Sequence, residues 1–311
     1  MLPAECRGNS TNQRWMCACG LKSAGCEKGM VLNMKLGIRA HDMERAPLET
    51  LVANIKNKGL TCTQLALSKV IDTFNVEAAA LTPGMAFHIR DIFAKNQVDI
   101  AVLGCYLNMT DPDAASREKI HDIYKAHIRF ARHLGCGMVG TETGAVNSAY
   151  AFEEANHSKE ALDWLIENVK RIVDYAERMG VIFSIEPVYT HIMSSLDRTY
   201  QVLQAVNSPN LQVIFDPVNI LHAGNYKEQD DIIKGAFELF GKNIAAIHVK
   251  DFKMVGDTFK PLPSGQGDFN YELLFKLIKE KKPYIHILME DTTPDNVFQA
   301  IGYLKNIYYA D

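Results

Sequence analysis

Short apolar runs alternate with longer amphipathic stretches along most of this chain, from residue 34 onward. Runs of this length predict buried strands, and apolar residues spaced three or four apart predict helices. The predicted strands cover residues 35–39, 62–65, 100–103, 138–140, 182–185, 212–215, 245–247 and 285–289. No apolar segment reaches the roughly 18 residues that a membrane-spanning helix needs, so no association with a membrane is expected.

The stretches between the strands carry the start and stop signals of helices. Start signals are a proline or a side chain that can cap the first turn, at Pro47, Thr82, Asp113 and Asp295. Stop signals are glycines just before a strand, where a helix ends with a positive φ, at Gly59, Gly135 and Gly180. The pattern predicts eight strand and helix units in series.

Four consecutive predicted strands end in a side chain that can bind a metal ion. These side chains belong to Glu186, Asp216, His248 and Glu290. A serial strand and helix repeat permits an open doubly wound sheet or a closed barrel. An open sheet brings few strand ends to its crevice, whereas a barrel makes all of them face one another. We therefore predict an α/β fold, a (β/α)8 TIM barrel, with the four side chains at one end.

The chemistry of these four side chains predicts a metal centre. One imidazole with three carboxylates suits a hard or borderline divalent cation, with Mn favoured and Mg, Co or Zn as alternatives. A single carboxylate at the end of a strand is more often a helix cap or a loop charge, so the prediction rests on four ligand types at matching places. No glycine-rich phosphate loop follows the first strand, and no nucleotide cofactor is expected.

Residues 1–33 differ from the rest of the chain. They lack a helical or strand period and contain four of the seven cysteines, with spacings that match no zinc motif well. We predict a disordered N-terminal extension rather than a metal knuckle, followed by a single barrel domain over residues 34–311. The three other cysteines lie in apolar contexts and are expected to be reduced thiols, which favours a cytoplasmic location.

The charge balance argues against a polyanionic partner. The formal net charge is −4, and lysine and arginine are scattered along the predicted helices, so no nucleic acid partner is expected. A small substrate that is uncharged or weakly anionic fits better. Tyr303, Tyr308 and Tyr309 in the last predicted helix suit either internal packing or the contact of a homo-oligomer.

Five short motifs in the second half of the chain form a specific set. They are Ile185-Glu186-Pro187, Phe215-Asp216-Pro217, His248-Val249-Lys250-Asp251, Gly265-Gln266-Gly267-Asp268-Phe269 and Met289-Glu290. In this set, residues 34–311 resemble the xylose isomerase-like barrels, a family of sugar phosphate isomerases and epimerases, ketohexose epimerases and inosose dehydratases. The resemblance implies that the four strand-end residues bind one divalent metal, and that Glu186 and Glu290 are also the catalytic acid and base.

Two positions depart from the ketohexose epimerases that this chain resembles. Where those enzymes have a substrate-binding histidine and a second glutamate, this sequence has Asn219 and Ile192, with His191 one position before the second place. Those enzymes also have an arginine near the seventh strand that binds the sugar. This sequence has no arginine at that place, and Lys250 is a nearby cation. These departures predict a substrate pocket unlike that of a ketohexose 3-epimerase.

The predicted substrate-binding residues lie within or after strands all around the barrel. They are His41, Gln64, Glu142, His191, Asn219 and Lys250. Three of them have a plainer explanation, since His41 can belong to a helix entry, Gln64 can fill the barrel interior and Glu142 can be a solvated loop charge. Asp251 can cap a turn or hold His248 in its metal-binding tautomer.

The metal ligands and the paired glutamates predict a sugar isomerase or epimerase that works by proton abstraction next to a carbonyl. A lyase of the same barrel type is the alternative, such as a keto-inositol dehydratase or an enzyme that cleaves 3-oxo-glycosides. A metal-dependent endonuclease of this fold would need further histidine ligands and a basic surface, which the net charge argues against. A carbohydrate-binding barrel without catalysis is the remaining alternative.

Overall fold

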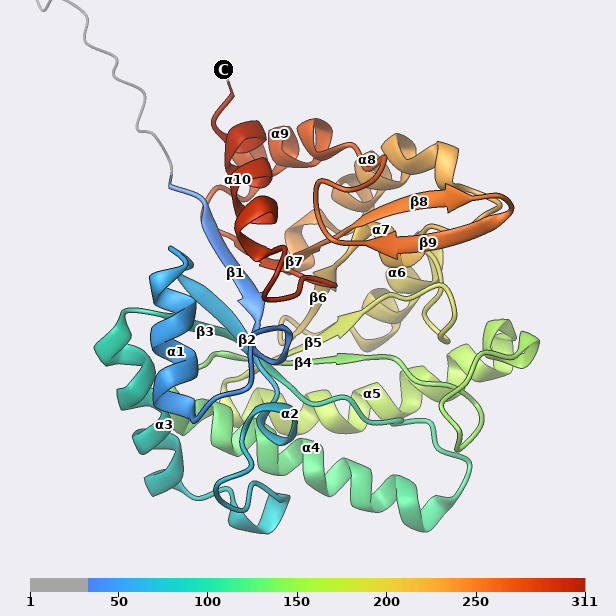
Figure 1. The fold of residues 1–311 in the computed structure, drawn as a ribbon. Coiled ribbons are helices and arrows are strands. Elements are labelled where there is room, and N and C mark those ends of the chain that lie inside the picture. The colour runs from blue at the N-terminus through green and yellow to red at the C-terminus, as the bar shows by residue number, and fades with distance from the viewer. Residues whose placement is uncertain (1–32, 311) are drawn as a thin grey trace, which may run out of the picture. The chain divides into compact units, whose positions relative to one another are not determined.

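Eight parallel strands close into a barrel in the computed structural model, which describes residues 33–310. Each barrel strand lies beside the barrel strand that precedes it in the chain, and β1 closes the ring by pairing with β10 (Figure 1). The barrel strands are β1 (Lys35–Arg39), β2 (Cys62–Leu65), β3 (Asp99–Gly104), β4 (Met138–Glu142), β5 (Ile182–Glu186), β6 (Leu211–Phe215), β7 (Ile244–Val249) and β10 (His286–Met289). The predicted α/β barrel is confirmed, whereas the predicted N-terminal extension lies outside the described residues, apart from Asn33.

A helix follows each barrel strand and lies on the outside of the barrel (Figure 1). These helices are α1 (Leu48–Asn57), α3 (Pro83–Asn96), α4 (Ala114–Leu134), α5 (Lys159–Met179), α6 (Leu196–Val206), α8 (Gln229–Leu239), α9 (Tyr271–Lys281) and α10 (Val297–Tyr308). Shorter helical segments lie in the connections: η1 (Ala40–Asp42), α2 (Leu67–Val70), η2 (Ala78–Ala80), η3 (Glu154–His157), α7 (Pro217–Ile220), η4 (Tyr226–Glu228) and η5 (Gly241–Asn243). None of the helices in residues 33–310 combines the length and the apolar composition that a bilayer crossing requires.

Most of the predicted helix signals act as expected. The Asp113 side chain accepts a hydrogen bond from the Ser116 amide at the start of α4, and Gly135 ends that helix with a φ of 80°. The last helix, α10, begins at Val297, close to the signal at Asp295, but its N-cap residue is Asn296, whose side chain accepts a hydrogen bond from the Thr293 amide.

An antiparallel hairpin inserted after β7 was not predicted. It consists of β8 (Asp251–Val255) and β9 (Thr258–Leu262), joined by a turn at Gly256 with a φ of 61°. Most of its residues are half-buried or exposed, so it lacks the continuous apolar run by which the barrel strands were found. The hairpin extends beyond the end of the barrel, next to the β7 exit (Figure 1).

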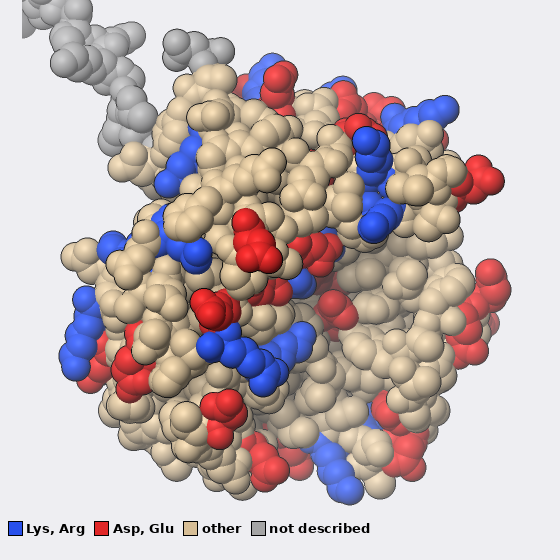
Figure 2. Space-filling model, in the orientation of Figure 1, with Lys and Arg blue, Asp and Glu red and all other residues tan. Residues whose placement is uncertain are grey.

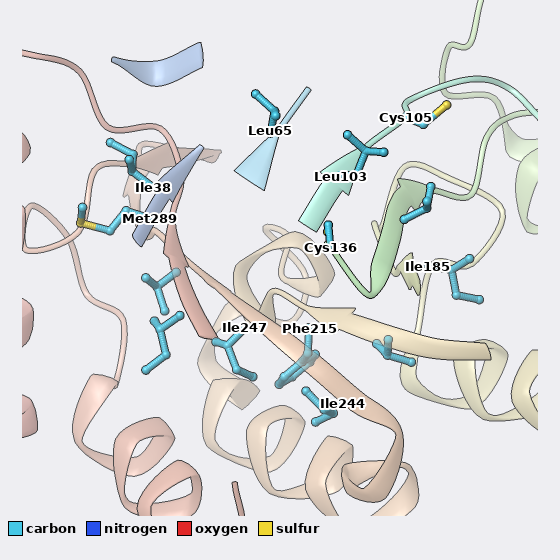
Figure 3. Close-up of a cluster of buried hydrophobic side chains, with 14 of the residues drawn as sticks. Ile38, Leu65, Leu103, Cys105, Cys136, Ile185, Phe215, Ile244, Ile247 and Met289 are labelled. Carbon is cyan, nitrogen blue, oxygen red and sulfur yellow. The ribbon is translucent and has the colours of Figure 1, made fainter. Parts of the chain in front are cut away.

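The outward faces of the barrel strands form the main core with the surrounding helices. Phe215, the last residue of β6, contacts Phe237 and Phe240 edge to face, with ring centroids 6.4 and 6.1 Å apart. Figure 3 shows Phe215 and Ile247 pointing from their strands toward helices. Because side chains alternate along a strand, the next residue after each outward one faces the barrel axis.

A smaller apolar cluster fills the barrel interior below the strand ends. It comprises Cys62, Ala101, Val102, Met138, Ile214, Ala246 and Leu288. Gly140 belongs to the same level, and a Cβ atom there would lie 2.5 Å from Val102 Cγ1 and 2.6 Å from Ile214 Cδ1. The interior is therefore a packed plug that supports the residues at its upper end.

Candidate metal centre

The side chains of Glu186, Asp216, His248 and Glu290 converge at the carboxyl-terminal end of the barrel. One ligand atom from each lies within 4.8 Å of all the others, and all four residues are buried. Each follows an outward-facing residue, as His248 follows Ile247, so the pleat of the strand directs it to the barrel axis. In Figure 2 the surface is hollowed beside the hairpin, and acidic side chains line the hollow.

His248 lies between the two glutamates. Its Nδ1 is 3.1 Å from Glu186 Oε1 and 2.9 Å from Glu290 Oε1, and its Nε2 is 2.8 Å from Gln64 Oε1. Burial lowers the pKa of His248, but the two carboxylates outweigh burial and raise the pKa to about 10. In the charge state that these neighbours favour, the ring is an imidazolium that donates from both nitrogens.

Lys250 brings a second buried cation to the cluster. Its Nζ lies 2.9 Å from Glu290 Oε2 and 3.2 Å from Asp216 Oδ2, and it donates to Asn219 Oδ1. Asn219 donates in turn from Nδ2 to Glu186 Oε1 at 2.8 Å. Three carboxylates and two cationic side chains therefore share one buried network, which contains three of the predicted substrate-binding residues, Gln64, Asn219 and Lys250.

The two glutamates differ in their electrostatic surroundings. Burial raises the pKa of Glu186, and His248 opposes this rise only in part. Burial acts on Glu290 in the same direction, but three cationic groups outweigh it and hold the pKa of Glu290 well below its ordinary value. These groups are Lys250, His248 and Arg39. Neighbouring carboxylates whose pKa values move in opposite directions are typical of acid and base sites.

The donor set fits a divalent cation. Asp216 Oδ1 accepts a hydrogen bond from the Val218 amide at 2.8 Å, whereas Asp216 Oδ2 is buried and accepts none within residues 33–310. Lys250 approaches Oδ2 to 3.2 Å without the geometry of a hydrogen bond. A buried carboxylate oxygen without a partner is costly, and a cation shared with the other three ligands removes that cost. A buried group that can hold a metal ion is present, as predicted.

Arg39, the last residue of β1, is a site residue that the sequence reasoning missed. Its Nη1 lies 3.0 Å from Glu290 Oε1, and its Nε lies 2.8 Å from Asp42 Oδ2. A signal was present, because Arg39 also closes a predicted strand. Only acidic and imidazole strand ends entered the metal prediction, and a guanidinium that holds a ligand in place belongs to neither class.

Glu142, the last residue of β4, forms a second polar cluster with Tyr150 and His191. Tyr150 OH donates to Glu142 Oε2 at 3.2 Å, and its ring stacks on His191 with centroids 5.0 Å apart. His191 Nδ1 lies 3.8 Å from Glu142 Oε2, is buried, and has no hydrogen-bond partner in the described part of the chain. Burial lowers the pKa of His191 to about 4, so this ring is neutral near pH 7.

Tyr150 is the second site residue that the sequence reasoning missed. Its φ of 54° lies in the left-handed region, which an aromatic residue rarely adopts and which is often found at functional loops. The conformation brings its hydroxyl to Glu142 and its ring to His191. No spacing or motif around Tyr150 marks this conformation in the sequence.

His41 and Gln64 lie on the β1 and β2 side of the site. His41 Nδ1 is buried and finds no hydrogen-bond partner among the residues described, and its Nε2 is 3.9 Å from Asp42 Oδ1. Burial, together with Arg39, lowers the pKa of His41 to about 4. Gln64 is fully buried and contacts His248. A role in substrate binding stays a prediction for both.

Asp251 caps a loop. Its Oδ1 accepts hydrogen bonds from the amides of Phe252 and Phe269 at 2.9 Å, and its Oδ2 accepts one from Gly265 at 3.0 Å. The first of the two roles predicted for Asp251 is therefore the one observed, since Gln64 is the residue that bonds to His248 Nε2.

The connections after β4 and β5, which carry Tyr150 and His191, are held together by Arg198 on α6. Its guanidinium donates only to main-chain carbonyls among the residues described, at distances of 2.6 to 3.3 Å. The acceptors are Ile192, His157, Asn156 and Ser158. One side chain thus fixes the two connections to each other.

Comparisons with known proteins agree with this architecture. A family model described as "Xylose isomerase-like TIM barrel" matches residues 21–307. A curated protein of Haemophilus influenzae (strain ATCC 51907 / DSM 11121 / KW20 / Rd), named "Putative L-ribulose-5-phosphate 3-epimerase SgbU", is 26% identical over 188 residues. The match covers 59% of this chain and 62% of that protein, so it spans less than two thirds of the relative.

Solved structures share the fold over most of this chain. A D-tagatose 3-epimerase-like protein has a TM-score of 0.69 at 18% identity, over 88% of this chain and 97% of its own. The IOLI protein, whose structure is described with a binding zinc atom, has a TM-score of 0.67 at 17% identity, over 88% of this chain and 96% of its own. At these identities the likeness shows the barrel fold.

Proposed function

The chain belongs to the xylose isomerase-like TIM barrel family, and from that membership we propose that it is a divalent-metal-dependent isomerase or epimerase of a sugar or sugar derivative. The observation that carries the proposal is the convergence of two glutamates, an aspartate and a histidine within 4.8 Å at the carboxyl end of the barrel. The name of the H. influenzae relative, a sugar phosphate epimerase, supports a sugar as the small-molecule substrate.

The proposed metal ligands are Glu186, Asp216, His248 and Glu290. Mn is the favoured ion for this donor set, with Mg, Co and Zn as alternatives. When bound, a divalent ion supplies a Lewis acid that polarises a substrate carbonyl and acidifies the neighbouring C–H bond. The remaining chemistry falls to the side chains of the chain itself.

Glu186 and Glu290 are the proposed catalytic residues. They approach the centre from β5 and β10 and share contact with His248 Nδ1. Glu186 is proposed to take a proton from the substrate on one side. Glu290, kept ionised by its three cationic neighbours, faces the same point from another strand and exchanges the proton on that side.

The proposed substrate-binding residues surround this centre. They are His41, Gln64, Glu142, His191, Asn219 and Lys250. Glu142 can accept hydrogen bonds from sugar hydroxyls, and the unbonded Nδ1 of His191 can bond to a further one. Lys250 and Asn219 already bridge the metal ligands, which places them beside any oxygen atoms bound at the centre.

Solvent exchange tests the proposal directly. The protein, loaded with Mn, is incubated in deuterated water with a panel of ketoses, aldoses and their phosphates. We expect deuterium at a carbon next to a carbonyl in at least one sugar and an isobaric product. Absence of exchange with every member of the panel would contradict the proposal.

A lyase of the same barrel type is the second candidate. It uses the same proton abstraction but expels a group β to the carbonyl, as in a keto-inositol dehydratase or an enzyme acting on 3-oxo-glycosides. The observation that favours it is His191, which is half-buried beside Glu142. Its buried Nδ1 has no hydrogen-bond partner within residues 33–310 and can assist a leaving group. Product mass separates the candidates, because a lyase product has lost water or an aglycone.

The compartment and the assembly state remain proposals. Cys62, Cys105 and Cys136 are buried free thiols, which supports a reducing compartment such as the cytoplasm. Tyr308 is buried against Phe275, and the half-buried Tyr303 packs on Tyr271. Tyr309 is exposed, so it is the one of the three that remains available for a contact in a homo-oligomer. Sedimentation of the purified protein tests the assembly state.

A further inference from the structure

Gln64 joins the candidate metal centre to the opposite side of the barrel. It lies on β2, is fully buried, and places its Oε1 2.8 Å from His248 Nε2 on β7. Its amide nitrogen donates to the hydroxyl of Tyr106, which follows β3. Both ends of the Gln64 side chain are therefore engaged, one by the metal centre and one by the tyrosine.

The position of Tyr106 is itself determined by its surroundings. A Cβ atom at Gly104 would lie 2.9 Å from Tyr106 Cε2 and 3.2 Å from its hydroxyl, so only glycine leaves room for the ring there. The ammonium of Lys69 lies over the Tyr106 ring, 4.6 Å from the ring centroid. A tyrosine held in this way offers a fixed acceptor to Gln64.

The orientation of the Gln64 amide sets the direction of each hydrogen bond. An amide that donates through its nitrogen to Tyr106 presents its carbonyl oxygen to His248. That oxygen can only accept, so His248 Nε2 must carry a proton. The other ring nitrogen, Nδ1, is the one that faces Glu186 and Glu290.

We propose that Gln64 and Tyr106 are positioning residues that keep the proton on His248 Nε2, so that Nδ1 is the nitrogen offered to the metal ion. The inference rests on the proposed metal centre and deepens it. It also changes the role of Gln64, which acts through His248 rather than on the substrate. Partners of this kind typically change metal affinity 10- to 100-fold when they are removed.

Three substitutions test the inference. Gln64→Met has a similar length and removes the acceptor. Gln64→Glu keeps it, since one carboxylate oxygen can accept from His248 and the other from the Tyr106 hydroxyl. Tyr106→Phe removes only the far contact. Gln212→Met is the matched control. Gln212 also lies on a barrel strand, but among the described residues its side chain bonds only to the Pro209 carbonyl, at the other end of the barrel.

The first measurement is the dissociation constant of Mn or Zn, by titration calorimetry without substrate. We expect about 10- to 100-fold weaker binding for Gln64→Met, a smaller loss for Tyr106→Phe, and nearly unchanged binding for Gln64→Glu and Gln212→Met. Metal-free thermal unfolding shows which variants are folded. If Gln64→Met does not fold, the comparison is between Tyr106→Phe and Gln64→Glu. Weaker metal binding by Tyr106→Phe supports the inference, and weaker metal binding by Gln64→Glu overturns it.

The second measurement is the histidine nitrogen spectrum of the zinc-loaded protein by NMR. His248 should show a proton on Nε2 in the wild type and in Gln64→Glu, and Gln64→Met should lose that single pattern. Wild-type affinity and an unchanged spectrum in Gln64→Met would overturn the inference. Neither measurement uses turnover, so a protein that binds metal as described but transforms no sugar would contradict the proposed function and leave this inference intact.

Discussion

The two halves of the barrel rim contribute to the site in different ways. The half formed by β5, β6, β7 and β10 supplies one candidate ligand from each strand end. The half formed by β1 to β4 supplies residues that act on those ligands or stand opposite them, such as Arg39 on Glu290 and Gln64 on His248. The first half carries the candidate ligands together with Lys250 and Asn219, and the second half adds contacts that influence the charge, protonation and orientation of those ligands.

The largest expected effect lies in the ligand half. Glu186→Gln or Glu290→Gln keeps the shape of the side chain but removes a carboxylate that the proposal requires for proton transfer. We expect a loss of roughly 10²- to 10⁴-fold in solvent exchange for each. Glu280→Gln, at an exposed position of α9, is the control and should keep full activity. Retention of wild-type exchange by either variant would contradict the proton-transfer role proposed for that glutamate.

Removal of the buried ammonium should be the next largest effect. Lys250→Met removes the ammonium that approaches the buried Asp216 carboxylate, and it removes one of the three cationic neighbours of Glu290. We expect the free energy of unfolding of the metal-free protein to fall by about 3 to 5 kcal/mol, measured by urea denaturation at pH 7.5. Added divalent ion should restore part of the loss, because it replaces the missing positive charge.

The control for that measurement is Lys281→Met at the exposed end of α9. A surface change of this kind should alter the free energy of unfolding by no more than about 0.5 kcal/mol. Equal losses in the two variants would show that the buried ion pairs of Lys250 add nothing to stability.

The supporting half should affect binding more than turnover. Glu142→Gln removes a charged acceptor that is not one of the four candidate ligands and that is held by Tyr150. We expect KM to rise about 10- to 100-fold, as for the loss of a hydrogen bond to a charged group, with a smaller change in kcat. Glu154→Gln, exposed in the same connection, should change neither. A fall in kcat with KM unchanged would move Glu142 into the reactive half.

The smallest effect concerns acid stability. Burial lowers the pKa of His191 to about 4, below its value near 6.5 in an unfolded chain. The unfolded state therefore binds more protons between these values, and stability is full above pH 6.5 and falls as the pH drops toward 4. The midpoint of urea unfolding should therefore fall less between pH 7 and pH 5 in His191→Asn than in the wild type. His88→Asn, an exposed histidine on α3, should leave it unchanged.

The ligand half could be predicted because each of its members follows an apolar run in the sequence. Glu186 and Glu290 each carry their own signal, and four such signals at strand and helix spacing suffice to predict the barrel that joins them. The same reasoning gave all eight barrel strands to within one or two residues, since a strand buried on both faces is marked by its own composition.

The supporting half could not be predicted in the same way. Gln64 and Tyr106 matter through contacts between different strands, and such contacts have no trace at a single position. Tyr150 depends on a positive φ that its neighbours in sequence do not require. The β8–β9 hairpin was not predicted for a simpler reason. Its exposed strands lack the apolar composition of the barrel strands.

Arg198 affects which substitutions the connections at this end of the barrel can accept during evolution. Its guanidinium holds two connections by their main-chain carbonyls, and every amino acid supplies the same carbonyl. Side chains in those connections, including the ones nearest His191, can therefore be exchanged without loss of this anchor. Under the proposed function, single substitutions in these two segments would alter the substrate pocket and leave this anchor in place.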